Sequence, residues 1–382
     1  MRGKPRIAIV TPGVFPIPSE TGSSVERVVH EFSVRLKDRF DFYVFGKFVP
    51  RGASWEEADG ITYIRPKRPR PVAYLKAVCE ILSRLGPDLI QVENRPKYAL
   101  ALKKAFPRIP VWLNLHSTTF IRPPLLADQS GRRVLSRADR IIVNSRYLRS
   151  RLPSFRRKPA VSVVYPGADT ETFANKWTTP GENEDCKRKL GYEGKTIVLF
   201  AGRLIPLKGV HHLLNVWPAI VAKHPEALLM VIGSARYGSH RITPYVMKLH
   251  ALGNRMPLHV RFIPFVPHAQ MPFWYGAADI AVVPSVAREA FGLVNAEAMA
   301  RGLPVIATDV GGIGEIVVHG ESGFLLRPSR IERDLFVYLD LLLGNSELRR
   351  EFGLRSASRI REHFTWEHTA QAMAELYARC LG

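Results

Sequence analysis

Two glutamates stand in a segment that is otherwise made mostly of small and aliphatic residues. The segment REAFGLVNAEAMARGLPVIATDVGG contains Glu289 and, eight positions later, Glu297. A carboxylate is costly to bury unless other groups pair with it. The run DIAVVPS predicts a strand before the segment, and a helix is expected from about Leu293 to Arg301, with Gly302 after its end. Glu289 then lies in the loop at the carboxyl end of the strand, and Glu297 lies about one turn inside the helix.

Each glutamate has an ordinary explanation that competes with a chemical one. In the ordinary one, Glu289 is a charge favoured by the helix dipole and Glu297 faces solvent. In the chemical one, both carboxylates bind a ligand at the carboxyl edge of a sheet. The nearby GGIGE stretch (Gly311 to Glu315) and the N–H groups at the helix start, which suit a phosphate, favour the second. Those N–H groups belong to Phe291, Gly292 and Leu293.

A second loop combines glycines with positive charge. In FAGRLIPLKGV a strand ends at Ala201, and Gly202, Arg203, Lys208 and Gly209 follow before the next helix. Glycines let a ligand approach the backbone closely, and Arg and Lys beside helix N–H groups form an anion site. The alternative is a solvated loop with two ordinary basic residues, because Gly-Arg-Leu alone is a short signal.

Short apolar runs alternate with amphipathic segments along the chain. Runs such as RIAIVTP, FDFYVFG, KTIVLFAG and ALLMVIG predict buried strands, and segments such as VERVVHEFSVRLKD and VHHLLNVWPAIVAKH predict helices. The alternation predicts an α/β fold with two doubly wound, Rossmann-like halves. Ligands of such sheets bind at the carboxyl ends of strands, so the expected site is a cleft between the halves.

The pattern divides the chain into two domains and a last helix. We expect an N-terminal domain over residues 1–170, a polar and turn-rich linker over 171–194, and a C-terminal domain over 195–362. The tail is expected to be helical throughout, and residues 363–382 form its last helix.

The chain is strongly basic, with 55 Lys and Arg against 34 Asp and Glu and a net charge of +21. This balance favours anionic partners, and much of the charge lies in two runs, Arg65 to Pro71 and Arg132 to Lys158. Plain solvated surface is the alternative for both runs. No zinc-finger spacing or aromatic RNA-binding signature accompanies them, so specific nucleic-acid binding is not expected.

Other classes are excluded by composition. No stretch reaches the roughly 20 apolar residues of a membrane span, and the first apolar run is too short for a secretory signal. The cysteines Cys79, Cys186 and Cys380 have no metal or disulfide spacing, which indicates a reducing, cytosolic compartment.

Together, the two loops resemble the signature of a known family. GRLIPLKG followed by PSVAREAFGLVNAEAMARGLPVIATDVGGIGEIV, with seven residues between the glutamates, is similar to the retaining glycosyltransferases of family four, which have the GT-B fold. The resemblance covers the whole second half. The first half is similar more loosely, through its order of elements and His116 in LNLHSTTF. The stretch QVENRPKYALALKKAFPRIPVWLNLH also resembles the spore-coat SA branch of the family.

The resemblance implies roles for these residues. Glu297 would bind the ribose hydroxyls of a nucleotide and Glu289 the hydroxyls of the transferred sugar, so both carboxylates would find their partners in the ligand. Arg203 and Lys208 would neutralise the diphosphate, and His116 would reach the donor sugar across the cleft. The backbone at the remaining nucleotide-binding positions would approach phosphate or sugar oxygens: Gly202, Phe291, Gly292 and Leu293.

The first loop departs from the family pattern. Many members carry a Gly-Gly pair before the first helix, whereas this chain has TGSS, Thr21 to Ser24. We expect Gly22 to bring the backbone close to phosphate or acceptor, and Ser23 or Ser24 to add a hydroxyl. In the family the last helix crosses back to the first domain, so residues 363–382 are expected to pack there.

The resemblance implies a hexosyltransferase that moves a sugar from a UDP- or GDP-sugar to a glycan, lipid-linked or small-molecule acceptor, in glycan or surface polysaccharide synthesis. The C-terminal domain would bind the donor and the N-terminal domain the acceptor. No Asp-x-Asp motif appears, so we expect no metal ion and no cofactor, with Arg203, Lys208 and a helix dipole stabilising the leaving diphosphate. No nucleophile is obvious, and the family is usually described as retaining configuration by front-face attack.

The alternative is a spore-coat or scaffold protein that keeps the GT-B fold and binds glycans without turnover. Intact Glu289, Glu297, Arg203 and Lys208 favour chemistry over this alternative. We expect a cytoplasmic protein, either unattached or peripheral at an anionic membrane or in the spore coat through its basic surface.

Overall fold

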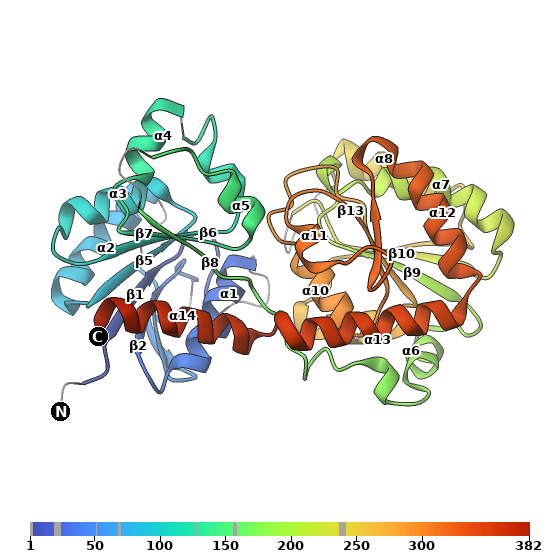
Figure 1. Cartoon of the computed structure of the whole chain (residues 1–382), viewed down its shortest axis with the longest axis horizontal. Coiled ribbons are helices and arrows are strands. Elements are labelled where there is room, and N and C mark those ends of the chain that lie inside the picture. The colour runs from blue at the N-terminus through green and yellow to red at the C-terminus, as the bar shows by residue number, and fades with distance from the viewer. Residues whose placement is uncertain are drawn as a thin grey trace. The chain divides into compact units, whose positions relative to one another are not determined.

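The structure is a computed structural model that describes residues 3–18, 24–50, 52–67, 70–126, 128–155, 159–236 and 242–382. The chain divides into two compact units: unit 1, Met1–Pro166 with Trp366–Gly382, and unit 2, Gly167–Thr365. Each unit is built on a sheet of mainly parallel strands with helices packed against it (Figure 1). The expected α/β fold with two doubly wound, Rossmann-like halves is confirmed.

Within the described residues, the sheet of unit 1 has eight strands in the order β3-β4-β2-β1-β5-β6-β7-β8. Its strand β1 is a nearly continuous apolar run, as expected for a strand that helices cover on both faces, whereas β5 carries the buried polar residues Gln91 and Glu93. All neighbours are parallel except β3 and β4. The strands are β1 (Arg6–Val10), β2 (Asp41–Phe45), β3 (Trp55–Ala58), β4 (Ile61–Ile64), β5 (Leu89–Glu93), β6 (Val111–Leu115), β7 (Arg140–Val143) and β8 (Ala160–Val163).

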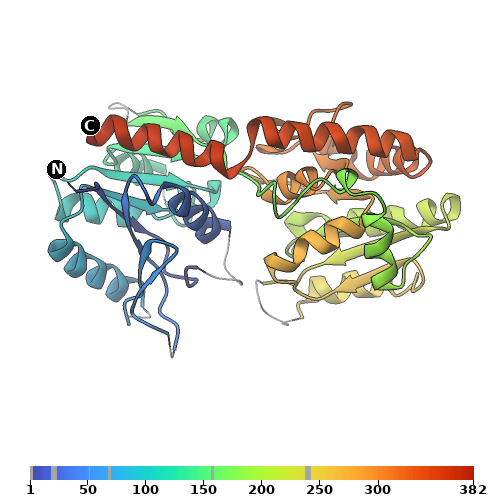
Figure 2. The same ribbon diagram turned by 90° about the horizontal axis from the view of Figure 1, so that it is seen from below.

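The helices of unit 1 lie on both sides of its sheet (Figure 2). They are α1 (Ser24–Leu36), α2 (Pro71–Leu85), α3 (Pro96–Ala105), the 3-10 helix η1 (Thr118–Ile121), α4 (Asp128–Leu135), α5 (Arg146–Ser150) and α14 (Trp366–Leu381). Helix α14 follows unit 2 in the chain but packs in unit 1 against α1. Its Tyr377 is fully buried, with its ring centroid 5.3 Å from those of Phe40 and Trp112. Segments from the two ends of the sequence therefore share one core.

The described sheet of unit 2 has six parallel strands in the order β11-β10-β9-β12-β13-β14. The strands are β9 (Thr196–Ala201), β10 (Ala227–Ile232), β11 (Val260–Ile263), β12 (Ile280–Val283), β13 (Val305–Thr308) and β14 (Gly323–Leu326). The helices are α6 (Glu182–Leu190), α7 (Val210–Lys223), α8 (Pro244–Gly253), α9 (Met271–Ala277), α10 (Leu293–Ala300), α11 (Ile313–Ile316), α12 (Ile331–Leu343) and α13 (Ser346–His363). Single 3-10 turns add η2 (Lys176–Thr178), η3 (Pro206–Lys208), η4 (His268–Gln270) and η5 (Pro328–Arg330).

Each sheet reverses its direction of winding at one pair of neighbouring strands. In unit 1 the chain builds outward from β1 through β2 to one edge and from β5 through β8 to the other. In unit 2 the corresponding pair is β9 and β12. The loops that leave the carboxyl ends of such a pair diverge to opposite faces and leave a crevice, which is where ligands bind in open α/β sheets. The fold thus marks one candidate ligand position in each unit.

The expected linker over residues 171–194 is instead a folded part of unit 2. It contains η2 and α6, and α6 packs against α9. The guanidinium of Arg301 pairs with Glu182 and donates to the carbonyl of Ala174. Burial lowers the pKa of Lys176 to about 8, and its ammonium donates to the carbonyl of Ala278 (2.6 Å). A segment that reads as polar and turn-rich is therefore held by buried ion pairs and hydrogen bonds.

Several smaller expectations also differ from the structure. The chain passes from unit 1 to unit 2 between Pro166 and Gly167 and returns to unit 1 between Thr365 and Trp366. Both points lie a few residues from the expected boundaries. The short strand β3 and helix α5 were not expected from the sequence. The tail is helical as expected and consists of α12, α13 and α14, with short breaks between them. No helix in the described ranges is long and apolar enough to cross a membrane.

The basic run from Arg65 to Pro71 is not uniformly solvated. Arg65 is 6 % exposed, and its guanidinium pairs with Glu56 (2.5 Å) and donates to the carbonyl of Ile17 (2.7 Å). Pro71 begins helix α2. Within this run, Arg65 therefore serves the packing of unit 1 instead of facing an anionic partner.

Candidate active site

Lys208 and Glu289 form an ion pair where two neighbouring strands of unit 2 end. Lys208 ends η3 in the loop after β9, and Glu289 lies in the loop after β12. Because β9 and β12 are the pair at which the sheet reverses, their loops border the expected ligand position. The Ser285 hydroxyl donates a further hydrogen bond to Glu289 (3.3 Å). The two side chains are 22 % and 17 % exposed, so the pair remains accessible to a ligand.

Glycines hold the basic loop close to the sheet. Gly209 has a φ of +70°, and a Cβ at this position would collide with the carbonyl of Pro284 after β12. Gly202 directly follows β9 and has a φ of +153°, which suits glycine. Arg203 follows it and is exposed. The loop therefore places Arg203 and Lys208 beside the carboxyl end of β9, as an anion site requires.

The backbone of Glu289 is fixed by its neighbours. Arg288 before it has a φ of +63°, which is uncommon for a residue other than glycine. The carbonyl of Glu289 accepts a hydrogen bond from the N–H of Gly312 (3.0 Å). Gly311 has a φ of +69°, and a Cβ there would collide with the same carbonyl. The GGIG stretch after β13 thus determines where Glu289 lies.

Helix α10 begins directly beyond this loop. Gly292 is its N-cap with a φ of +97°, and a Cβ there would collide with the amide of Asn295. Phe291 is buried with its ring 5.9 Å from that of Phe364, and Leu293 is the first helical residue. Asn295 has no exposed surface, and neither polar atom of its amide has a hydrogen-bond partner among the described residues. Glycine at the cap therefore leaves room for this amide.

Glu297 lies inside α10 and is 5 % exposed, so the solvent-facing alternative is wrong. Its carboxylate lies 3.1 Å from Nε2 of His268 and accepts a hydrogen bond from the hydroxyl of Tyr275 (3.4 Å). The ring of Phe173 packs 5.4 Å from that of His268 and 5.8 Å from that of Tyr275. Glu297 is thus held by the elements η4 and α9 that precede β12.

His116 follows β6 in unit 1, and its side chain is only 6 % exposed. Its Nε2 lies 2.6 Å from the carboxylate of Glu93, the last residue of β5, which has no exposed surface. The backbone N–H of His116 donates to the side chain of Asn94 (2.8 Å), and its carbonyl accepts from the side chain of Asn144 (3.3 Å). The carboxyl ends of the neighbouring strands β5 and β6 therefore hold a histidine and a buried carboxylate as a pair.

Comparison with known proteins identifies the family. Residues 182–359 match a family model described as glycosyl transferases group 1, and residues 25–172 match one described as glycosyltransferase family 4. Spore coat protein SA of Bacillus subtilis (strain 168) is 31 % identical over 380 residues, which span 98 % of this chain and 99 % of that protein. The chain belongs to the family-four glycosyltransferases.

Two other similarities cover nearly the whole of this family-four chain. The putative glycosyltransferase YtcC of Bacillus subtilis (strain 168) is 29 % identical over 383 residues, 98 % of this chain and 92 % of that protein. The crystal structure of Anabaena HepE in complex with UDP and glucose has a TM-score of 0.77 at 23 % identity, over 97 % of this chain and 99 % of that one. The likeness to HepE supports the GT-B fold.

The site residues expected from the sequence fall into three groups. The unit 2 residues gather in loops at the carboxyl ends of β9 and β12 and at the start of α10, as described above. His116 belongs to unit 1. Gly22 and Ser23 lie outside the described residues, and Ser24 begins α1. The ligand roles of all these residues stay predictions.

One expectation about the two glutamates needs correction. The sequence led us to expect that both carboxylates find their partners in the ligand, but each already has partners in the protein. Glu93, Tyr275 and His268 were not among the residues predicted from the sequence. Glu93 carried a signal, since a glutamate ends the apolar run PDLIQVE where a strand should meet its ligand.

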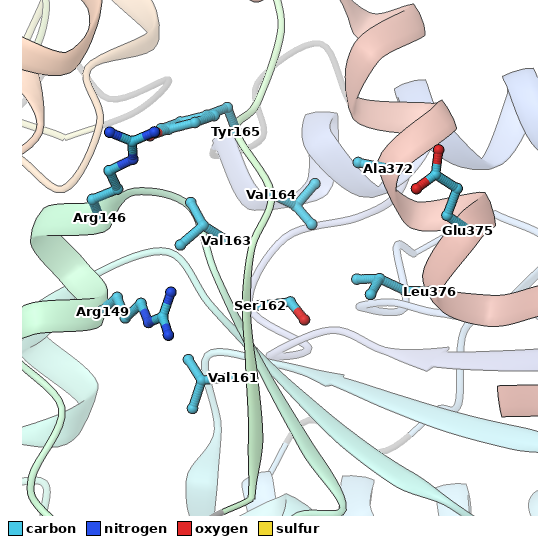
Figure 3. Close-up of a pocket in the computed structure, with 10 residues that line it drawn as sticks. All are labelled: Arg146, Arg149, Val161, Ser162, Val163, Val164, Tyr165, Ala372, Glu375 and Leu376. Carbon is cyan, nitrogen blue, oxygen red and sulfur yellow. The ribbon is translucent and has the colours of Figure 1, made fainter. Parts of the chain in front are cut away.

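A separate groove of about 660 Å³ lies at β8, the edge strand of unit 1 (Figure 3). Arg146 and Arg149 from α5 line one side, and Glu375 and Leu376 from α14 line the other. Figure 3 shows the side chain of Arg146 extending toward the ring of Tyr165. The two arginines belong to the basic span from Arg132 to Lys158, so part of that span borders a concave surface. The groove contains none of the predicted site residues.

Gly311 and Gly320 have similar positive φ angles, but only Gly311 packs on Glu289. Substitution of the two glycines should therefore have different effects on stability. Gly320 has a φ of +77° and open space around its Cα, so Gly320→Ala should lower the free energy of unfolding by about 1–2 kcal/mol. Gly311→Ala adds a collision with the carbonyl of Glu289 and should cost more than about 2 kcal/mol. Urea unfolding of both variants measures this, and equal losses would show that Gly311 does not support the Glu289 loop.

Proposed function

We propose that this protein transfers a sugar from a nucleotide-diphosphate sugar to an acceptor hydroxyl, with retention of the anomeric configuration. The observation that carries the proposal is the Lys208–Glu289 ion pair, accessible and located where the unit 2 sheet reverses. A lysine paired with a carboxylate can exchange that partner for a phosphate, which leaves the carboxylate available for sugar hydroxyls. One site can in this way bind both the phosphate groups and the sugar of a nucleotide-diphosphate sugar.

The proposed mechanism needs positive charge at the leaving group. Arg203, Lys208 and the N–H groups at the start of α10 would stabilise the negative charge that develops on the diphosphate as its bond to the sugar breaks. Glu297, one turn inside α10, would accept hydrogen bonds from the ribose. His268 and Tyr275 orient the Glu297 carboxylate and so prepare it for that role.

Retention is proposed to follow from attack on the face that the diphosphate leaves. The bond between the anomeric carbon and the phosphate oxygen breaks, and the acceptor oxygen forms its bond on the same face. The acceptor proton passes to the departing phosphate oxygen, so no protein nucleophile is required. The products are a glycoside and a nucleoside diphosphate.

Relatives suggest the class of donor and acceptor. HepE was crystallised with UDP and glucose and also with UDP-glucose, which supports a UDP-sugar as the first donor to test, with GDP-sugars next. The acceptor is proposed to be a glycan, a lipid-linked sugar or a small molecule bound by unit 1, in glycan or surface polysaccharide synthesis. No metal ion or cofactor is proposed to take part.

A second candidate function comes from the similarity to Spore coat protein SA, which extends over nearly the whole of both chains. In this alternative the protein is a coat or scaffold component that binds glycans without turnover. The basic span from Arg132 to Lys158 would then attach it to an acidic polymer or an anionic membrane surface. The two functions differ in one measurable step, the cleavage of a donor.

We expect a UDP- or GDP-sugar to raise the melting temperature and to be turned over. At a donor concentration of 100 Kd, binding should stabilise the protein by about 2.7 kcal/mol. A panel of nucleotide sugars should first be tested by thermal shift, and release of nucleoside diphosphate should then be measured with and without glycan acceptors. Proton NMR of the product identifies its anomeric configuration. Binding without cleavage would favour the scaffold function, and an inverted product would contradict the proposed mechanism.

Substitution of the two glutamates should affect different kinetic constants. Glu297 is proposed to bind ribose equally in the ground and transition states, so Glu297→Gln should raise the donor KM roughly 10- to 100-fold. Glu289 is proposed to lie nearer the anomeric carbon, so Glu289→Gln should lower kcat by about 100-fold. Glu321→Gln, an exposed glutamate in the turn before β14, is the matched control. Full activity of both folded site variants would show that the carboxylates are structural.

Activity should persist in excess EDTA. Arg203 and Lys208 are proposed to supply the positive charge that a divalent ion provides in metal-dependent transferases. Initial rates should be compared with and without EDTA, with added magnesium and manganese as controls. Complete loss of activity that either ion restores would defeat the metal-independent mechanism.

A further inference from the structure

A chain of hydrogen bonds runs through the core of unit 1 from α14 to His116. The hydroxyl of Tyr377 donates to Oε1 of Gln91 (2.7 Å), and Nε2 of Gln91 donates to Oε1 of Glu93 (2.6 Å). The other carboxylate oxygen of Glu93 lies 2.6 Å from Nε2 of His116. Tyr377, Gln91 and Glu93 have no exposed surface, and the side chain of His116 is 6 % exposed.

The hydrogen bonds of this chain run in a fixed donor-to-acceptor direction. Burial raises the pKa of Tyr377 well above its usual value, so its hydroxyl keeps its proton, and it donates a hydrogen bond to Oε1 of Gln91. The amide oxygen of Gln91 must then face Tyr377, and its NH2 group must face Glu93. A carboxylate only accepts hydrogen bonds, so the Nε2 of His116 carries a proton and donates a hydrogen bond to Glu93. In a neutral ring with its proton on Nε2, the Nδ1 atom has a lone pair.

We propose that Glu93 is a positioning residue that fixes the tautomer and orientation of His116, and that Tyr377 of α14 sets this arrangement through Gln91. A histidine held in this way presents Nδ1 as an acceptor for a hydroxyl hydrogen, which suits a sugar. The kinetic part of the proposal rests on the proposed transferase function, but the tautomer part does not.

A purely structural role explains these four residues less well. A buried carboxylate is costly, and an apolar residue at the end of β5 would pack without that cost. The backbone of His116 is already held by Asn94 and Asn144, so Glu93 is not needed to fix the loop. What Glu93 adds is control of one ring nitrogen, a function that hydrogen-bond partners of histidine commonly perform.

The first test reads the tautomer by NMR of protein labelled with 15N-histidine, with the His116 signals assigned by their loss in His116→Ala. The wild-type ring should be in the Nε2–H form. In Glu93→Gln, the NH2 of Gln91 still points at position 93, so the new amide must turn its oxygen to Gln91 and its NH2 to His116. The ring should therefore switch to the Nδ1–H form.

Adding Tyr377→Phe to Glu93→Gln provides a rescue. Without the tyrosine hydroxyl, Gln91 can turn over, the amide at position 93 can present its oxygen to His116, and part of the Nε2–H signal should return. An unchanged tautomer in folded Glu93→Gln, or no return of the signal in the double variant, would overturn the proposal.

The second test is kinetic. Glu93→Gln should lower kcat about 10- to 100-fold with little change in the donor KM. In a His116→Ala background the same substitution should change kcat by less than about twofold, because Glu93 acts through His116. Glu367→Gln, which removes the α1–α14 ion pair between Glu367 and Arg35 (2.7 Å), is the control for weakened docking of α14.

The outcomes of the two tests are separable. The positioning role would be overturned if the losses of kcat caused by Glu93→Gln and by His116→Ala multiplied in the double variant. If the wild-type protein has no transferase activity, the proposed function fails, and the tautomer measurement alone decides whether Glu93 controls His116.

Discussion

Carboxylates withdrawn from water must be matched by hydrogen-bond donors, and this requirement organises the candidate sites of both units. Glu93 is matched by Gln91 and His116 in unit 1, and Glu297 is matched in part by His268 in unit 2. The partners come from different strands, helices and loops, so each match fixes several elements at once. The local structure around each site therefore follows from the position of one buried negative charge, and changes to its partners act on the site as a whole.

Much of the fold could be predicted because its signals are local. Strands of a parallel sheet that are covered on both faces read as apolar runs, and the alternation with helices gave both sheets. The helix expected from Leu293 to Arg301 is observed as Leu293–Ala300, with Gly302 in the left-handed conformation (φ +79°). The partners of the glutamates could not be predicted in the same way. His268 is 29 positions from Glu297 in the sequence, and only the tertiary fold brings the two together.

The largest error concerned charge rather than hydrophobicity. Residues 171–194 are polar and rich in turn formers, which is also the composition of a solvated linker. Here Lys187 is 5 % exposed and pairs with Asp279 (3.1 Å), while Arg301 pairs with Glu182. A sequence does not distinguish a charge that faces water from one that has found a buried partner. The short edge strand β3 could not be predicted either, because its residues are mostly exposed and include two glutamates, so it lacks the apolar pattern of a core strand.

The membership of α14 in unit 1 has a consequence for the order in which the protein acquires its structure on the ribosome. Unit 1 is begun first, but its core lacks a helix until residues 366–382 have been made, after the whole of unit 2. Chains emerge at about 5–20 residues per second, and domains generally fold as units during synthesis. Unit 2 can therefore be complete while the surface of unit 1 that α14 covers is still open. During that interval α1, Phe40 and Trp112 lack their packing partner, and Gln91 and Glu93 lack the hydroxyl that terminates their hydrogen-bond chain.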